Sequence, residues 1–317
     1  MEQFWQQLLS TTFLVALLSS CVRLAMPLLL AGLGETFAER SGILNIGIEG
    51  IMLMGAMVGF IGSRVTGNAW LGLLCGILAG MLMASLHAFL SVSVGADQVV
   101  SGLSVNILSL GLSMFAFRSL YGLAGQAVKA PGFDVLPIPG LSQLPLLGPI
   151  LFRQQALVYL GLLLVPVAYF VLFRTTFGQQ ITAAGEDPLA AESMGVDALR
   201  IRYACVLIGG ATAGMAGVFL SLGELRGFSE LMVAGRGFIA VAVVMFGRWN
   251  PVGALLAALL FGLADALQIH LQAFSISSIP PHLLLSLPYL ITLLAVVSGI
   301  GRGFIPSALC VPYRREH

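Results

Sequence analysis

The single lysine of this chain sets the first limit on its chemistry. A phosphate-binding P-loop has the pattern GxxxxGK[ST], and its lysine contacts the phosphates of the nucleotide. The only lysine here, Lys129, stands in the sequence Val128-Lys129-Ala130, outside any such pattern. The chain therefore cannot hydrolyse ATP through a P-loop of its own.

Residue types that build metal sites or catalytic triads are scattered along the chain. The four histidines lack the spacing of a metal motif such as HExxH, and the four cysteines form no CxxC pair. No Ser/His/Asp constellation stands out either. We therefore expect no catalytic residue, no metal site and no cofactor.

Polar side chains recur at helical spacing inside two apolar runs. Asn106, Ser109 and Ser113 fall at i, i+3 and i+7 of one run, and Asp265 and Gln268 share a face of another. Polar groups are costly in lipid, so these faces should look inward, and they are the candidate pathway for a hydrophilic solute. Hydrogen bonding between helices is the alternative for the Asn/Ser face, and a subunit interface is the alternative for Asp265.

The composition shows which surroundings these residues need. Of 317 residues, 58% are hydrophobic and only 9% are charged, against about 25% charged in soluble domains. One soluble core could not hide that much apolar surface. This excludes a soluble enzyme, a disordered chain and, with a net charge of only +1, a nucleic-acid-binding protein.

Apolar runs long enough for membrane helices follow one another along the chain. Two look interrupted: one contains Glu49, and the other is short and follows Gly235-Arg236-Gly237. Glu49 would lie ~10 Å into its helix if that helix begins at Gly42, where a structural and a functional role fit equally well. The sequence predicts an all-α polytopic membrane protein with about nine transmembrane helices (eight to ten). The runs are 8–33, 44–62, 69–95, 98–123, 155–173, 201–223, 235–248, 251–272 and 283–301.

Two longer polar stretches interrupt the runs, at 124–154 and 174–200. Arginines gather around the second stretch and in the C-terminal tail, and basic residues favour the cytoplasmic side of a membrane. We therefore expect 174–200 and the C-terminus to face the cytoplasm and 124–154 to face outside.

The second polar stretch contains a short helix with defined ends. Asp187 is a good N-cap and Pro188 suits the first helical position, while Gly195 provides a left-handed stop. The helix between them should offer Leu189 and Met194 on one face. That apolar face favours docking into a groove on a partner over the alternative, a solvated connector.

Several glycines are spaced four residues apart within the apolar runs. Glycines at four-residue spacing (Gly72, Gly76 and Gly80; Gly55 and Gly59; Gly210 and Gly214) indicate close helix packing within the chain, with a subunit interface as the alternative.

Leu33-Gly34-Glu35 and Leu222-Gly223-Glu224 each precede an interrupted run, which predicts two related halves. Their spacings differ by two residues, so chance similarity is the other interpretation.

Three segments together carry a family resemblance. The stretch GETFAERSGILNIGIEG (34–50) resembles the signature of permease subunits of ABC importers in the branched-chain amino acid, ribose and nucleoside permease superfamily. GEDPLAAESMGV (185–196) resembles the coupling loop of that superfamily, and GRGFIAVAVVMFGRWN (235–250) is similar to its simple-sugar and nucleoside branch. Gln179-Gln180 departs from the pattern, because relatives often carry a basic residue there.

The resemblance implies a single transmembrane permease domain over residues 1–317, in the cytoplasmic membrane, without catalysis of its own. Its partners would be a cytoplasmic ATP-binding subunit, a second permease chain that is different but related, and an external binding protein. No nucleic acid is expected. The ATPase-coupling residues would be Asp187, Pro188, Leu189, Glu192, Met194 and Gly195.

The expected function is ATP-driven import of a small hydrophilic solute, most simply a nucleoside. Ribose or another simple sugar and a branched-chain amino acid are the alternative solutes. An ion-coupled secondary transporter is the rival class, because interrupted helices and Asp265 would suit it too. The coupling-like helix and the lack of a paired intramembrane charge relay count against that class.

Overall fold

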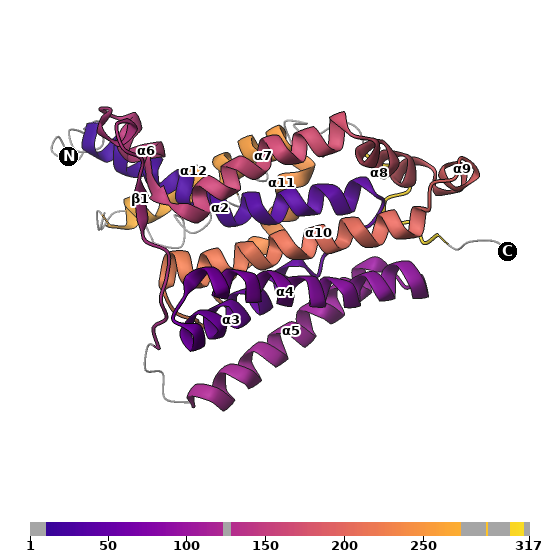
Figure 1. The fold of residues 1–317 in the computed structure, drawn as a ribbon, viewed down its shortest axis with the longest axis horizontal. Coiled ribbons are helices and arrows are strands. Elements are labelled where there is room, and N and C mark those ends of the chain that lie inside the picture. The colour runs from indigo at the N-terminus through magenta and orange to yellow at the C-terminus, as the bar shows by residue number, and fades with distance from the viewer. Residues whose placement is uncertain (1–10, 123–127, 274–289, 291–304, 314–317) are drawn as a thin grey trace.

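The computed structural model describes residues 11–122, 128–273, 290 and 305–313. In this part of the chain, seven helices are long and apolar enough to cross a membrane, and they lie side by side along the long axis of the molecule (Figure 1). The seven are α2 (Thr11–Arg40), α3 (Ile48–Thr66), α4 (Ala69–Ala88) with its π-helical extension η1 (Phe89–Val94), α5 (Gln98–Tyr121), α7 (Ala156–Arg174), α10 (Ala198–Val218) with its π-helical extension η3 (Phe219–Leu225), and α12 (Pro251–Ala273).

An eighth apolar helix, α11 (Arg236–Phe246), is too short to span a bilayer by itself. It matches the short run predicted at 235–248. The ninth predicted run, 283–301, lies outside the described residues except for residue 290. An all-α membrane protein with interrupted helices is therefore confirmed.

The helix α2 continues past the predicted end of the first run at residue 33 and reaches Arg40. Three charged residues lie in this added part of α2, and all three are buried with polar partners. Glu35 accepts a hydrogen bond from the Asn45 backbone N–H, and Glu39 accepts one from the Trp249 indole N–H. Arg40 donates to the Trp249 carbonyl. Paired in this way, the charged groups can continue a buried helix.

The two predicted loops lie at opposite ends of the helix bundle (Figure 1). The stretch 124–154 holds a strand β1 (Val135–Pro137), the short helices η2 (Leu141–Gln143) and α6 (Leu147–Leu151), and the start of β2 (Arg153–Gln155), which pairs antiparallel with β1. The stretch 174–200 holds α8 (Thr176–Glu186) and α9 (Pro188–Ser193). The hairpin and α8 were not predicted, because these segments were interpreted as polar connections.

Close approach of glycines holds the centre of the bundle together. A Cβ atom added at Gly55 would lie 2.5 Å from the Cα of Gly214, and one added at Gly80 would clash with the Gly210 carbonyl. These contacts join α3 and α4 to α10. The prediction that the spaced glycines serve close helix packing within the chain is therefore confirmed.

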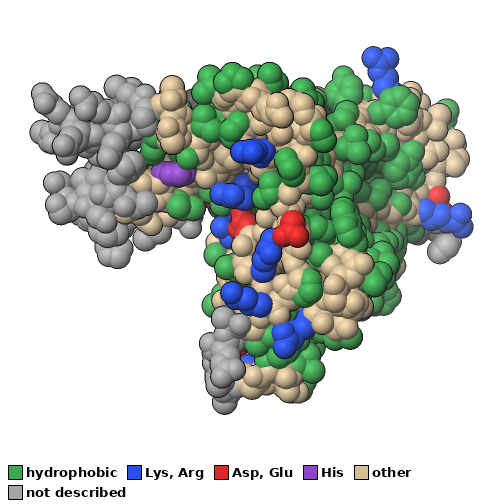
Figure 2. Space-filling model, turned by 60° about the vertical axis from the view of Figure 1, so that its left-hand side comes forward, with side chains coloured by type: hydrophobic (Ala, Val, Ile, Leu, Met, Phe, Trp, Pro, Cys, Tyr) green, Lys and Arg blue, Asp and Glu red, His purple; other side chains and the backbone are tan. Residues whose placement is uncertain are grey.

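The surface agrees with a membrane environment. Figure 2 shows hydrophobic side chains over much of the visible face, with most of the visible Lys, Arg, Asp and Glu in a central band and a few more at the right-hand end. Along α5, Ile107 and Phe115 are each 72% exposed, which would be unfavourable in water. Such side chains are at no disadvantage against lipid or another membrane subunit.

Candidate functional site

Two helices begin inside the bundle rather than at its ends. The helix α3 starts at Ile48 after an irregular segment, and its Gly55 packs on Gly214, a little beyond the middle of the continuous helix α10–η3. The helix α11 starts at Arg236 after the irregular segment 226–235. Both interruptions predicted from the sequence are present. Glu49 lies in the first turn of α3, so its predicted place ~10 Å into a helix from Gly42 is wrong.

The Glu49 carboxylate caps the helix α11. Its Oε1 accepts a hydrogen bond from the Gly235 N–H and its Oε2 accepts one from the Gly237 N–H, each at 2.7 Å. The first N–H groups of a helix have no partner within the helix, and the N-cap residue Gly235 has no side chain to supply one. Glu49 therefore supplies from α3 the cap that α11 lacks.

Asn106 on α5 likewise forms hydrogen bonds with the backbone at the start of α3. Its Oδ1 accepts a hydrogen bond from the Gly50 N–H at 2.7 Å, and its Nδ2 donates to the Ile46 carbonyl at 3.0 Å. The start of α3 is thus tied to α5 by one amide side chain. This is the interhelical hydrogen bonding named above as the alternative role of the Asn/Ser face.

A cavity of about 470 Å³ lies between α3, α5 and the start of α11. Its polar side chains are Glu49 and Asn106, and the rest of its wall is apolar or glycine backbone. The apolar wall residues are Leu53, Leu103, Ile107, Leu110, Leu231, Val233, Ala234 and Phe238. A largely apolar concave wall with a few polar groups at one side is the usual form of a small-molecule site.

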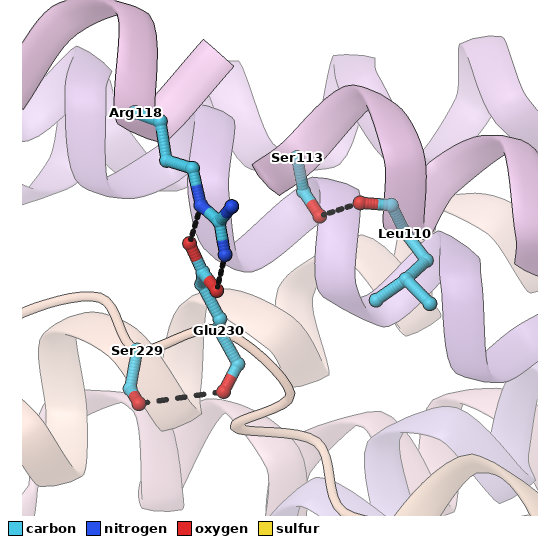
Figure 3. A network of polar contacts seen from close by, with 5 residues as sticks. All are labelled: Leu110, Ser113, Arg118, Ser229 and Glu230. Atoms are coloured by element: carbon cyan, nitrogen blue, oxygen red, sulfur yellow. Dashed lines mark hydrogen bonds and ion pairs between the residues drawn. The ribbon is translucent and has the colours of Figure 1, made fainter. Parts of the chain in front are cut away.

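The remaining pathway candidates lie away from this wall. Ser109 is buried against Gly50, and the buried Ser113 hydroxyl donates to the Leu110 carbonyl (Figure 3). Asp265 and Gln268 are half-buried on α12. The structure therefore does not bring the five candidates together: only Asn106 lines the cavity.

One charged residue near these carboxylates was not among the predicted site residues. Arg236, the first residue of α11, interacts electrostatically with Glu49, Glu224 and Asp265. The carboxylate of Asp265 thus has a basic neighbour. The signal in the sequence was the Gly235-Arg236-Gly237 triplet before a short apolar run, which marks a charged helix start inside the membrane region.

The segment that leads into α11 is fastened to α5 by an ion pair. Arg118 donates from Nε and from a terminal nitrogen to the two oxygens of Glu230, at 2.7 and 2.8 Å (Figure 3). The hydrogen bonds from Arg118 hold the pKa of the Glu230 carboxyl below its ordinary value. Both side chains are partly exposed, so the pair fixes geometry more than it adds stability.

At the end of the molecule where α8 and α9 lie, the predicted short helix is present. Asp187 accepts hydrogen bonds from the N–H groups of Leu189 and Ala190, and Gly195 has a φ of +84°. The side chains of Leu189 and Met194 are 62% and 84% exposed. The caps are as predicted and both apolar side chains are exposed, but the helix ends at Ser193, so Met194 lies just after it.

The C-terminal segment lies at this same end. The Ala308 N–H donates to the Gly185 carbonyl, and the Ser307 hydroxyl donates to the Glu186 carboxylate. Arg202, at the start of α10 and almost fully buried, donates to the Ser41 carbonyl. Residues 41–42 of the signature stretch, the end of α8, the start of α10 and the segment 305–313 are therefore in contact at this end.

The two halves of the chain share an order of elements. In each half a long helix containing Leu-Gly-Glu is followed by an irregular segment and a helix that begins inside the bundle: α2 then α3, and α10–η3 then α11. The end of α2 meets the start of α10, so the two long helices run antiparallel. Two such interrupted helices facing one cavity are typical of transport proteins.

A family model described as "Branched-chain amino acid transport system / permease component" matches residues 17–305. This chain belongs to that family. The family expected from the signature is thereby confirmed, and the chain is a permease component of an ABC transporter. No solved structure matches it.

Three relatives match nearly the whole permease. It is 42% identical to "Putative glucose ABC transporter permease protein TsgC13" of Haloferax volcanii, over 96% of this chain and 99% of the relative. It is 40% identical to the guanosine ABC transporter permease protein NupQ of Bacillus subtilis, over 91% and 93%. It is 36% identical to the nucleoside ABC transporter permease protein NupC of Lactococcus lactis, over 90% and 93%.

Proposed function

We propose that this permease imports a nucleoside. The observation that carries the proposal is the similarity, over nine-tenths of the chain, to relatives named for guanosine and nucleosides. The cavity supports it, because its wall offers wide apolar contact for a planar base and few polar groups for a sugar alone. A simple sugar is the second candidate, favoured by the relative named for glucose.

The solute route follows the cavity between α3, α5 and α11. In this proposal Asn106 meets the solute directly, and Ser109 packs on Gly50 of α3. Ser113, Asp265 and Gln268 do not line this cavity, and their part in the pathway stays a prediction.

The partners follow from the kind of transporter. A cytoplasmic ATP-binding subunit supplies the energy, a second and related permease chain completes the pathway, and an external binding protein delivers the nucleoside. The helix α9 docks on the ATP-binding subunit through Leu189 and Met194, with Glu192 at a basic rim and Asp187, Pro188 and Gly195 fixing its length.

This arrangement requires α9 and the C-terminus to face the cytoplasm. A cysteine introduced at Ser193 should then resist a membrane-impermeant thiol reagent added to intact cells, whereas one at Ser142 should react. The two sites lie at opposite ends of the bundle, so they must label oppositely (Figure 1). Labelling of the Ser193 site from outside would invert the proposed topology.

An uptake assay in intact cells tests which solute the permease imports. Cells that express the whole importer should accumulate tritiated guanosine, and excess unlabelled inosine should compete while excess glucose and ribose should not. Cells that carry the other subunits without this chain provide the background. Competition by glucose or ribose, without competition by inosine, would show that the imported solute is a sugar and not a nucleoside.

A further inference from the structure

The contact between Glu49 and α11 bears on which solutes the cavity accepts. We propose that Glu49 is the charge-selecting residue of the pathway: it fills the N-terminus of α11, so the cavity takes uncharged solutes and turns away those with a phosphate or carboxylate. The inference rests on the proposed function in one respect, because it takes this cavity to be the solute route.

The start of α11 has the features of an anion site. Its N–H groups at Gly235 and Gly237 point to one place, where two carboxylate oxygens accept them at 2.7 Å. A helix N-terminus carries a partial positive charge and binds phosphate or carboxylate groups through such N–H groups. Arg236 interacts electrostatically with Glu49, but also with Glu224 and Asp265, so the two N–H groups are the feature that would draw an anion. Without Glu49, these N–H groups would be open to a solute anion.

Two hydrogen bonds and a close backbone contact hold Glu49 in place. A Cβ atom added at Gly237 would lie 2.6 Å from both the Cα and the backbone N of Glu49, so the backbones of α3 and α11 are in direct contact there. The carboxylate is therefore a fixed part of the wall. A solute phosphate would have to displace it or lie against its negative charge, and neither is favourable.

The rest of the wall does not compensate for this charge. Asn106 is already bound to the Gly50 N–H and the Ile46 carbonyl. The other side chains are apolar and cannot neutralise an anion. A neutral solute meets no such cost, which matches a nucleoside and excludes a nucleotide.

Sulfate tests the inference without knowledge of the natural solute. In the full-length chain with Glu49→Gln, one N–H of α11 loses its acceptor, because a side-chain amide cannot accept through both of its terminal atoms. We expect tens of millimolar sulfate to raise the melting temperature of E49Q by about 2–4 °C over chloride at equal ionic strength. The wild type should show no difference between the two salts.

Asp97→Asn is the matched control. Asp97 caps the N-terminus of α5 with one hydrogen bond, from the Val100 N–H, and does not line the cavity. Asparagine keeps that bond while removing the charge, so D97N should respond to sulfate like the wild type. Without this control, the sulfate response of E49Q could be explained by the loss of a carboxylate at any helix start.

Each outcome decides the question. A sulfate response confined to E49Q, or recovery of E49Q from membranes in sulfate but not in chloride, supports charge selection by Glu49. An equal response of the wild type, or E49Q equally unstable in both salts, overturns it. Because sulfate is the probe, a failure of guanosine uptake would revise the proposed function and leave this inference standing.

Discussion

Replacing Leu189 with Asp should leave a folded chain that no longer retains the ATP-binding subunit. Leu189 is 62% exposed on α9, between the Asp187 cap and the Gly195 stop. Burial of such a side chain in a partner groove contributes about 1.5–3 kcal/mol, so its loss weakens docking by roughly one to two decades. The aspartate adds the cost of burying a charge, so the effect should exceed simple truncation.

Co-purification of the ATP-binding subunit measures this directly, together with solute-stimulated ATP hydrolysis. Leu141→Asp is the matched control, because Leu141 is a comparably exposed leucine in a short helix at the opposite end of the bundle. Leu141→Asp should retain the subunit. If Leu189→Asp retains it equally and the chain is folded, α9 is a connector and has no part in coupling.

Replacing Gly214 with Leu should prevent the bundle from closing. The Cα of Gly214 lies 2.5 Å from the place where a Cβ on Gly55 would stand, and a Cβ on Gly214 would clash with the Gly76 carbonyl. The atoms nearest to this added Cβ belong to the backbone of α4, so no side chain can turn aside. Overpacking alone costs about 1–3 kcal/mol, and separating three helices should cost more.

The readout is the yield of monodisperse protein in detergent and its melting temperature. Gly111→Leu is the matched control, since Gly111 lies in a helix with no atom within 4 Å of an added Cβ. That substitution should leave yield and melting temperature close to those of the wild type. Equal behaviour of the two variants would contradict the packing of α10 against α3 and α4.

Local rules predicted the features whose causes are local. The cap at Asp187, the proline at the first helical position and the left-handed Gly195 act within a few residues, so α9 could be predicted with its ends. The short run after Gly235-Arg236-Gly237 likewise indicated an interrupted helix.

Features that depend on distant partners could not be predicted. The helix α2 passes through Glu35, Glu39 and Arg40, and each of these buried side chains has a hydrogen bond to Asn45 or Trp249. Glu49 caps a helix that begins almost two hundred residues later, and no spacing in the sequence announces that contact. The polar stripe on α5 was recognised, but its Asn106 is bound to α3, its Ser109 packs on Gly50 of α3, and neither serine lines the cavity.

The central claim is that this permease moves its solute only when a separate subunit hydrolyses ATP. Proteoliposomes provide the most direct test, with the permease reconstituted either alone or with its ATP-binding subunit, second permease chain and binding protein. We expect concentrative uptake of tritiated guanosine by the complete assembly with ATP, and none by this chain alone under an imposed proton or sodium gradient. Concentrative uptake by this chain alone under such a gradient would contradict it and identify a secondary transporter.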